Sequence, residues 1–228
     1  MNKYAIIVAG GAGLRMGGGL PKQFLLLHNK PVIWHSINAF FEAYADIRVI
    51  LVLPETHLSE GEAIIKSTAC PDQIKLTKGG DTRFQSVKNG LEEVPAGTVV
   101  CIHDAVRCLV TPALIQRCYV SAMKAGNAVP AIGAVDTIRI ATSGGNHMID
   151  RNQVKIIQTP QAFLTDLVKP AYRQEYLDSF TDDSSVVESR GYEIHLVEGE
   201  TTNIKITRPV DLLVAGMILE ERTRASNT

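Results

Sequence analysis

Three short, nearly continuous apolar runs constrain the fold most strongly. They lie at residues 4–9, 47–53 and 99–102 and read YAIIVA, IRVILVL and VVCI. A strand with one solvent-exposed face would alternate polar and apolar residues, and these runs do not. Runs of this length and composition are typical of strands that are buried on both faces of a parallel sheet. A fourth run, AVPAI from Ala128, is a further strand candidate.

The segments between these runs have the spacing of helices. Pro31, Pro112 and Pro209 are each placed to begin a helix, because proline suits the first helical position. Apolar residues then recur on one helical face, at Ile33, Ile37, Phe40, Phe41 and Tyr44, at Leu114, Ile115, Cys118 and Met123, and at Val210, Leu213, Val214, Met217 and Ile218. Strands alternating with helices predict an α/β fold of Rossmann-like type, with a mostly parallel sheet and right-handed crossovers. We expect one domain spanning residues 1–228, with ligands bound at the carboxyl ends of the strands.

One segment, at about residues 136–160, departs from this pattern. It carries two short strand candidates on either side of TSGGN, and Gly144-Gly145-Asn146 is a strong hairpin turn signal. We therefore predict a β-hairpin arm that projects from the α/β body. A two-stranded hairpin is marginally stable alone, so the prediction includes a partner subunit that covers the arm.

Charge and composition exclude several classes of protein. The net charge is −1 at pH 7, which argues against a nucleic-acid surface, so any anion site must be local. No stretch approaches the ~20 apolar residues of a membrane span, and run 4–9 is too short for the core of a signal peptide. The four cysteines lack CxxC spacing and suit a reducing compartment. We expect a cytoplasmic protein that binds neither nucleic acid nor membrane.

The first apolar run leads into AGGAGLRMGGGLPKQF, residues 9–24, where glycines surround Arg15 and precede Lys22. A dinucleotide-binding turn is weakly supported, because Gly11 and Gly13 match GxGxxG but the third glycine position holds Met16. A P-loop is excluded, because no Ser or Thr follows the lysine. The remaining specific interpretation is a loop that wraps a nucleoside triphosphate, with backbone amides and both cations on the phosphates. A flexible loop with solvated cations is the simpler alternative.

Two other stretches place polar groups near strand ends. Asp104 follows the buried run 99–102 in HDAVR, where a carboxylate faces the ligand crevice and suits Mg²⁺. A turn or helix-capping role is equally compatible with that position. Arg107 could orient a substrate or pair with Asp104. GGDTRFQS is a glycine turn that enters a helix, whose N-terminus attracts polar groups.

Residues 9–24 resemble the signature of the sugar-phosphate cytidylyltransferases. The resemblance extends over nearly the whole chain through GGDTRFQSV, HDAVR, VDTIR, IDRNQVKIIQTPQAF, TDDSSVVE and VEGETTNIKITRPVDL. It implies a nucleotidyltransferase sheet and transfer of a cytidylyl group from CTP to a sugar-alcohol phosphate, with release of pyrophosphate. The acceptor that the motifs match best is 2-C-methyl-D-erythritol 4-phosphate, of non-mevalonate isoprenoid biosynthesis. Ribitol 5-phosphate is the alternative acceptor, because the enzymes that use it share these motifs.

The resemblance also implies roles for individual residues. The predicted catalytic residues are Arg15, Lys22, Arg151 and Lys205. The predicted substrate-binding residues are Ala9, Gly10, Gly11, Gly13, Gly80, Asp81, Ser86, Asp104, Ala105, Arg107, Thr137 and Thr159. Among these, Gly80, Asp81 and Ser86 are implied to recognise cytosine, and Arg151 and Lys205 to hold the acceptor phosphate. The sequence pattern predicts Arg151 on the returning strand of the arm and Lys205 on a late strand in NIKIT. The family further implies Mg²⁺ at Asp104 and a homodimer, in which an arm residue reaches the neighbouring subunit's site.

Direct transfer between phosphates needs no protein nucleophile, and no Ser-His-Asp, Cys-His or HExxH arrangement stands out in the sequence. Two rivals from other classes remain, a nicotinamide-dependent oxidoreductase and a catalytically silent binding protein. The missing third glycine counts against the first, and the retention of every predicted cation counts against the second. One departure from the family pattern is Cys108, where proline commonly follows the arginine of HDAVR; it changes the stiffness of the loop and not its charge.

Overall fold

A computed structural model describes residues 2–9 and 20–226 of the 228-residue chain. Its strands are β1 Lys3–Val8, β2 Leu26–Leu27, β3 Lys30–Pro31, β4 Arg48–Leu53, β5 Ile74–Lys78, β6 Val99–Asp104, β7 Asn127–Gly133, β8 Ile138–Thr142, β9 Gly145–Ile149, β10 Lys155–Ile157, β11 Gln161–Leu164 and β12 Leu196–Glu198. Its α-helices are α1 Val32–Ala43, α2 Leu58–Lys66, α3 Arg83–Glu92, α4 Pro112–Ala125, α5 Thr165–Ala171, α6 Asp183–Glu188 and α7 Pro209–Ser226.

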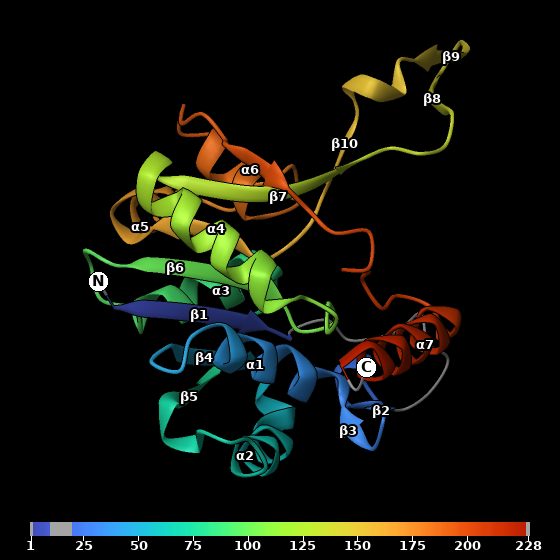
Figure 1. Ribbon diagram of the computed structural model, residues 1–228. Helices are drawn as coiled ribbons and strands as arrows, with labels where there is room; N and C mark the ends of the chain where they lie inside the picture. The colour runs from blue at the N-terminus through green and yellow to red at the C-terminus, as the bar shows by residue number, and fades with distance from the viewer. Residues whose placement is uncertain (1, 10–19, 227–228) are drawn as a thin grey trace.

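The central sheet has the strand order β10-β7-β11-β6-β1-β4-β5, and β12 pairs with β7. Pairs β1–β4, β1–β6, β4–β5 and β7–β12 are parallel, whereas β10 and β11 run antiparallel to their neighbours. The α/β prediction with a mostly parallel sheet is therefore confirmed. After β1 the chain builds one side of the sheet through β4 and β5, then returns to place β6 on the other side of β1 (Figure 1). Ligands in such sheets bind where the strand order reverses, beyond the carboxyl ends of β1 and β6.

Strands β1, β4 and β6 are buried on both faces, as their continuous apolar runs predict. In β1, Ala5 and Ile7 pack against one helical layer, while Ile6 and Val8 pack against the other. The first layer is formed by α1, α2 and α4, and the second by α3, α5 and α6. Packing on both faces fixes the sheet rigidly and leaves its carboxyl edge open for ligands.

The predicted starts of these three helices are confirmed to within one residue. Pro112 and Pro209 are the first residues of α4 and α7, and Pro31 lies directly before α1. On α4, the predicted stripe residue Met123 is 48% exposed. The stripe on α7 departs further from the prediction, because Leu213 and Met217 are each 71% exposed. This helix turns its other face, including Ala215, toward the small core of Leu27, Leu109 and Ile206.

The predicted hairpin arm is present as β8 and β9, which lie away from the sheet (Figure 1). Two details differ from the expectation. Thr142 pairs with Gly145, so the turn is made by residues 143–144, and Gly145 already belongs to β9. The φ of Gly145 is 136°, which glycine adopts without steric cost. The end of the predicted arm range returns to the main sheet, where β10 pairs with β7.

Within the described residues, the helices are too short or too polar to cross a lipid bilayer.

Candidate active site

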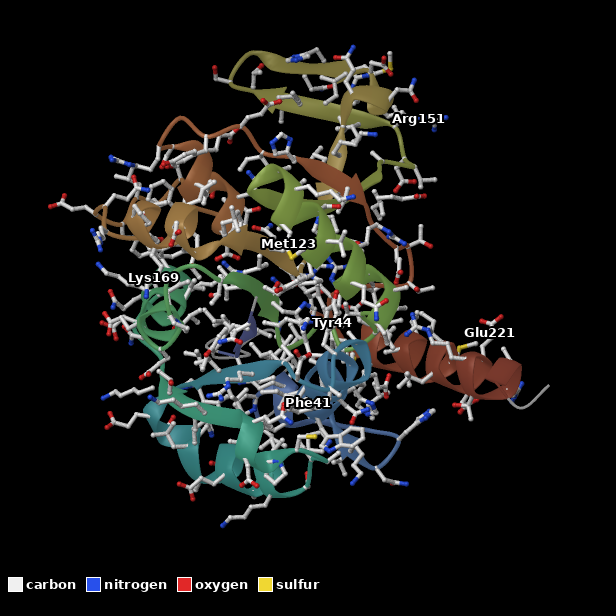
Figure 2. All side chains as sticks on the ribbon, turned by 60° about the vertical axis from the view of Figure 1, so that its left-hand side comes forward. Phe41, Tyr44, Met123, Arg151, Lys169 and Glu221 are labelled. Carbon is white, nitrogen blue, oxygen red and sulfur yellow. The ribbon has the colours of Figure 1, made fainter. Side chains whose placement is uncertain are left out.

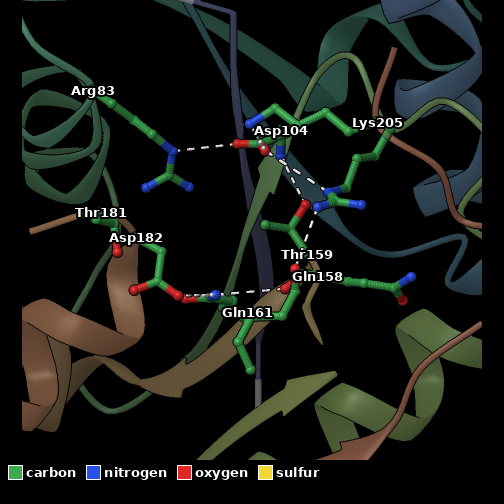
Figure 3. A pocket seen from close by; sticks show the side chains of 10 residues that line it. Arg83, Asp104, Gln158, Thr159, Gln161, Thr181, Asp182 and Lys205 are labelled. Atoms are coloured by element: carbon green, nitrogen blue, oxygen red, sulfur yellow. Dashed lines mark hydrogen bonds and ion pairs between the residues drawn. The ribbon is translucent and has the colours of Figure 1, made fainter. Parts of the chain in front are cut away.

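A pocket of about 260 Å³ lies at the carboxyl end of β6, where the strand order reverses. Figure 3 shows its side chains, which come from α3, the end of β6, the segment around β11, the start of α6 and the chain before α7. The lining residues are Arg83, Asp104, Arg107, Ile157, Gln158, Thr159, Gln161, Thr181, Asp182 and Lys205.

Asp104 is the centre of charge in this pocket. Its carboxylate lies 2.8 Å from Lys205 Nζ, 3.2 Å from Arg83 Nε and 3.9 Å from Arg107 Nε. Within the described residues, Arg83 also pairs with Asp183, which leaves Lys205 and Arg107 as the cations that suit phosphate groups.

The charges around Asp104 hold it ionised. Burial alone would raise the pKa of this carboxyl, but Arg83 and Lys205 outweigh burial and keep the pKa well below its usual range. Burial likewise would lower the pKa of Arg83, yet Asp183 and Asp104 together raise it well above the usual arginine value. Both groups therefore carry their full charge at neutral pH.

Arg83 is held in place by a buried anchor. Its guanidinium donates to both oxygens of Asp183, at 2.9 and 2.7 Å, and the Tyr172 hydroxyl donates to the same carboxylate at 2.5 Å. Asp183 is completely buried. Two parallel hydrogen bonds fix the plane of a guanidinium, so Arg83 presents only its Nε edge to Asp104.

Arg107 is positioned by main-chain carbonyls. Its Nη1 donates to Asn203 O at 2.9 Å, and its Nη2 donates to Ile157 O at 3.4 Å. The Nε–H is buried and has no hydrogen-bond partner within residues 2–9 and 20–226. A buried donor without a partner is costly, which makes this atom a candidate contact for a ligand oxygen in the pocket.

Another part of the pocket wall carries Asp182 among polar groups. Asp182 caps α6 by accepting from the Ser185 amide, and it also accepts from Gln161 Nε2 and Ser184 Oγ. Burial would raise the pKa of Asp182, but these hydrogen bonds lower it. Anionic groups are therefore directed to the Lys205 side of the pocket, away from this carboxylate.

Four predicted site residues meet in this pocket: Asp104, Arg107, Thr159 and Lys205. Two further predicted residues, Ala105 and Ala9, directly follow β6 and β1. Ala105 is buried and donates its amide to Val8 O, which ties the end of β6 to β1. Ala9 continues from β1, and its carbonyl accepts from the buried Gln23 side chain at 2.9 Å.

Lys22 lies close to the segment that carries Lys205. Lys22 Nζ lies 3.4 Å from the carbonyl of Ile206, the residue next to Lys205. Arg15, Gly10, Gly11 and Gly13 lie outside the described residues.

The predicted cytosine-binding residues cluster at the start of α3. The Gly80 amide donates to Ser86 Oγ at 3.1 Å, and Asp81 is exposed beside them. A side chain at position 80 would lie within 2.1 Å of the Gln85 side chain, so only glycine fits. Thr82 caps the helix by accepting from the Gln85 amide, which fixes where Arg83 begins it.

The arm residues stay outside the pocket of their own chain. Thr137 is exposed, and Arg151 is exposed on the arm, where it donates to Val135 O at 2.7 Å (Figure 2). The sequence places Arg151 on the returning strand, but it lies in a 3-10 turn after β9, because the Asp150 side chain caps that turn. Lys205 is also not in a strand. Its segment is irregular and is held by the Ile206 amide, which donates to Val106 O.

Sequence reasoning missed several pocket residues, namely Arg83, Gln158, Gln161, Thr181, Asp182 and the anchoring Asp183. The sequence does contain one local indication that Arg83 has a special role. It is the first residue of α3, where the helix dipole disfavours a cation. Such a residue needs a tertiary partner, and the sequence does not show that its partner lies 100 positions further along.

The acid groups of this site make a prediction about pH. Asp104 has a lowered pKa in the folded state, so its contribution to stability is present above about pH 4 and lost as pH falls. Burial lowers the pKa of His103 to about 3, which acts in the same direction below about pH 6.5. We expect the free energy of unfolding, from urea titrations, to fall steadily between pH 7 and pH 3. In Asp104→Asn the fall below about pH 4 should be shallower than in wild type; equal slopes would contradict this account of the charge cluster.

Comparison with known proteins identifies the family. Residues 4–221 match the family model described as 2-C-methyl-D-erythritol 4-phosphate cytidylyltransferase. The chain is 44% identical over 219 residues to the protein of that name from Phocaeicola vulgatus, covering 96% of this chain and 100% of the relative. It is 45% identical over 219 residues to that from Bacteroides fragilis, with the same coverage.

Comparison with solved structures supports the same family. The crystal structure of 2-C-methyl-D-erythritol 4-phosphate cytidylyltransferase from Thermus thermophilus is 29% identical, with a TM-score of 0.76 over 96% of this chain and 98% of that one. The crystal structure of 4-diphosphocytidyl-2C-methyl-D-erythritol synthase from Anaerococcus prevotii is 26% identical, with a TM-score of 0.83 over 96% of both chains. Motif, fold and pocket thus lead to one conclusion: the chain belongs to the 2-C-methyl-D-erythritol 4-phosphate cytidylyltransferase family.

Proposed function

We propose that this protein transfers a cytidylyl group from CTP to 2-C-methyl-D-erythritol 4-phosphate and releases pyrophosphate, in isoprenoid biosynthesis. The observation that carries the proposal is the convergence of Lys205, Arg83 and Arg107 on Asp104 in a chain of this family. The named relatives favour this acceptor over ribitol 5-phosphate.

The reaction needs charge control more than a protein nucleophile. A phosphate oxygen of the acceptor attacks the α-phosphorus of CTP, and the bond to the bridging oxygen of pyrophosphate breaks. Both reactants are anions, so positioning and positive charge supply most of the catalysis. In this proposal Arg15 and Lys22 bind the triphosphate and stabilise the charge that develops on the leaving pyrophosphate.

The acceptor phosphate binds on the cationic side of the pocket. Lys205 is 43% exposed there, and Arg107 offers its unpartnered Nε–H. The Thr159 hydroxyl lines the same wall. The polar side, with Asp182 and Gln161, repels a second phosphate and so favours one orientation of the acceptor.

The base and the sugar of CTP occupy the glycine-rich edge. Gly80 and Ser86 provide a backbone amide and a hydroxyl beside the exposed Asp81, which is enough to recognise a pyrimidine. Ala9, Gly10, Gly11, Gly13 and Ala105 supply backbone groups along the nucleotide.

We also assign Mg²⁺ as the metal ion, with Asp104 as its protein ligand. Within the described residues, no three His, Cys, Asp or Glu side chains gather as a metal cluster. A single carboxylate nevertheless fits Mg²⁺, which usually takes one or two carboxylates and completes its shell with substrate phosphates and water. When bound, the ion would supply positive charge to the triphosphate. Asp104 is kept ionised for this role by its cation neighbours.

The arm supports a homodimer. Arg151 and Thr137 are exposed on a two-stranded hairpin and do not line the pocket of their own chain. We propose that the arm of a second copy brings both residues to the acceptor beside Lys205. A cytoplasmic location is part of the same proposal, because CTP is a cytoplasmic substrate.

Mixing two inactive variants tests this sharing. Lys22→Ala and Arg151→Ala should each be nearly inactive with the acceptor. If Arg151 acts across the dimer, half of the mixed protein is heterodimer and each heterodimer has one intact site, so pyrophosphate release should recover to about a quarter of wild type. If Arg151 serves its own chain, no heterodimer has an intact site and nothing is restored. Mixing must include a cycle of unfolding and refolding, with refolded wild type as the control.

The assay for the function itself is pyrophosphate release with CTP and Mg²⁺, offering methylerythritol phosphate and ribitol 5-phosphate in parallel. Release with the first alone is the expected result. Release with the second alone would keep the mechanism and overturn the acceptor. Release with neither, from protein that is folded by circular dichroism, would overturn the proposed function.

A further inference from the structure

A buried histidine links three parts of the pocket. His103 lies in β6 directly before Asp104 and is completely buried. Its Nε2 lies 3.2 Å from the carbonyl oxygen of Arg107, and its Nδ1 lies 3.0 Å from Thr159 Oγ1. The Asp104 amide donates to the same Thr159 oxygen at 3.1 Å. The ring thus joins both ends of the turn 104–107 to the strand segment that carries Thr159.

The partners determine which ring nitrogen carries the proton. A carbonyl oxygen can only accept, so Nε2 must be the donor toward Arg107. Thr159 Oγ1 already accepts from the Asp104 amide, and its own proton is free to be donated to Nδ1. The neutral Nε2–H tautomer therefore satisfies every donor and acceptor in this series of hydrogen bonds, from the Asp104 amide through Thr159 and the ring to the Arg107 carbonyl. The lowered pKa of His103 is in line with a neutral ring.

The surroundings leave the ring one orientation. Phe40 packs edge-on against it, with ring centroids 5.3 Å apart. The Ala105 carbonyl inside the turn accepts from Ser36 Oγ at 2.7 Å, and Asn203 Nδ2 donates to the Thr159 carbonyl at 2.9 Å. Packing and hydrogen bonds therefore fix the ring, and the ring in turn fixes the Thr159 hydroxyl and the Arg107 main chain.

We propose that His103 is a positioning residue, which as the Nε2–H tautomer sets the Thr159 hydroxyl and the turn 104–107 for the acceptor half of the reaction. This inference rests on the proposed function for its catalytic consequence. His103 lies behind the pocket lining and acts through Thr159 and Arg107. It exchanges no proton with substrate.

The hydrogen-bond chain can be tested without activity. Protein labelled with ¹⁵N-histidine should show the Nε2–H tautomer for His103 by two-bond N–H correlation NMR at pH 7, with His103→Gln identifying the signal. Thr159→Val should shift the Nδ1 resonance, because it removes the hydrogen bond donor. A δ-protonated or doubly protonated ring in the wild type would overturn the proposal, whatever the activity assay shows.

Two substitutions separate the two hydrogen bonds. His103→Gln retains a donor near Nε2 for Arg107 and loses the acceptor for Thr159, whereas His103→Asn retains an acceptor near Nδ1 and loses the donor. Each should lower kcat/KM for the acceptor roughly 10- to 100-fold, because small misplacements at a reacting centre are costly. The KM for CTP should change less than about twofold, since the loss is confined to the acceptor side. A rise in the KM for CTP as large as the loss in kcat/KM for the acceptor would show a merely structural role and overturn the proposal.

Coupling to Thr159 provides a second check. Adding Thr159→Val to His103→Gln should cost little more than either change alone, because both remove the same hydrogen bond. Thr159→Ser, which keeps the hydroxyl, should recover most of the activity that Thr159→Val loses. His35→Gln is the matched control, since His35 also bonds a main-chain carbonyl, that of Leu27, away from the pocket; it should match wild type. If the effects of His103→Gln and Thr159→Val on activity added fully in the double variant, the two residues would not act through one hydrogen bond, which would contradict the proposal.

Discussion

Replacing Lys22 with alanine is expected to lower kcat by about 100-fold or more, while changing the KM for the acceptor by less than about threefold. The ammonium group of Lys22 lies 3.4 Å from the carbonyl of Ile206, the residue after Lys205. The buried Gln23 side chain, which donates to Ala9 O, anchors the adjacent backbone. A cation held there meets the charge that grows on the leaving pyrophosphate, and that charge is largest in the transition state.

The measurement is steady-state pyrophosphate release at saturating CTP and Mg²⁺. Lys66→Ala, an exposed lysine on α2, is the matched control and should retain wild-type kcat. Lys22→Arg should recover part of the activity, because it keeps the charge but not the compact ammonium geometry. Unchanged kcat in Lys22→Ala would remove Lys22 from the mechanism.

Asp183→Ala is expected to have the largest effect on stability, about 3–5 kcal/mol. Asp183 is completely buried and accepts three hydrogen bonds, two from Arg83 and one from Tyr172. Its removal leaves the phenol hydroxyl without its partner and leaves the guanidinium with only its Nε contact to Asp104 among the described residues, and breaking a buried ion pair is far more costly than losing a surface one. Arg83 would also lose the anchor that aims it at Asp104.

Urea unfolding followed by circular dichroism gives the free energy difference, provided that the m-value stays constant. Asp46→Ala is the contrasting control. Asp46 forms an exposed ion pair with Lys3, so its loss should cost no more than about 1 kcal/mol. Tyr172→Phe should fall between the two, because it removes one hydrogen bond and leaves the Arg83 pair intact. A cost for Asp183→Ala similar to that for Asp46→Ala would mean that the buried pair contributes little.

The fold was predictable where the signal is local. Runs such as residues 47–53 have no polar face, so they can only be strands buried on both sides, and the structure has β4 there between β1 and β5. Proline at the start of α4 and α7 marks helix starts for an equally local reason. The turn signal at Gly144 located the hairpin but not its register, since residues 143–144 form the turn.

The site was predictable only in part. Asp104 and Arg107 lie beside a recognisable buried strand, so their place at the carboxyl edge follows from sequence. Arg151 was assigned to a strand and lies in a turn, because one side chain, Asp150, caps the local backbone. Lys205 was assigned to a strand and lies in an irregular segment, although its side chain still reaches Asp104.

The sequence by itself determined the layered α/β architecture, the position of the hairpin and the chemical types that handle phosphate, because each depends on residues close together in the chain. Only the tertiary structure decided that Arg83 joins Asp104 to Asp183, and that His103 joins Arg107 to Thr159. Three of these contacts span 21, 100 and 56 positions, and the shortest, between His103 and Arg107, spans 4 positions across the turn after β6. Burial gives such long-range pairs their strength, since hydrogen bonds and charges interact more strongly away from water.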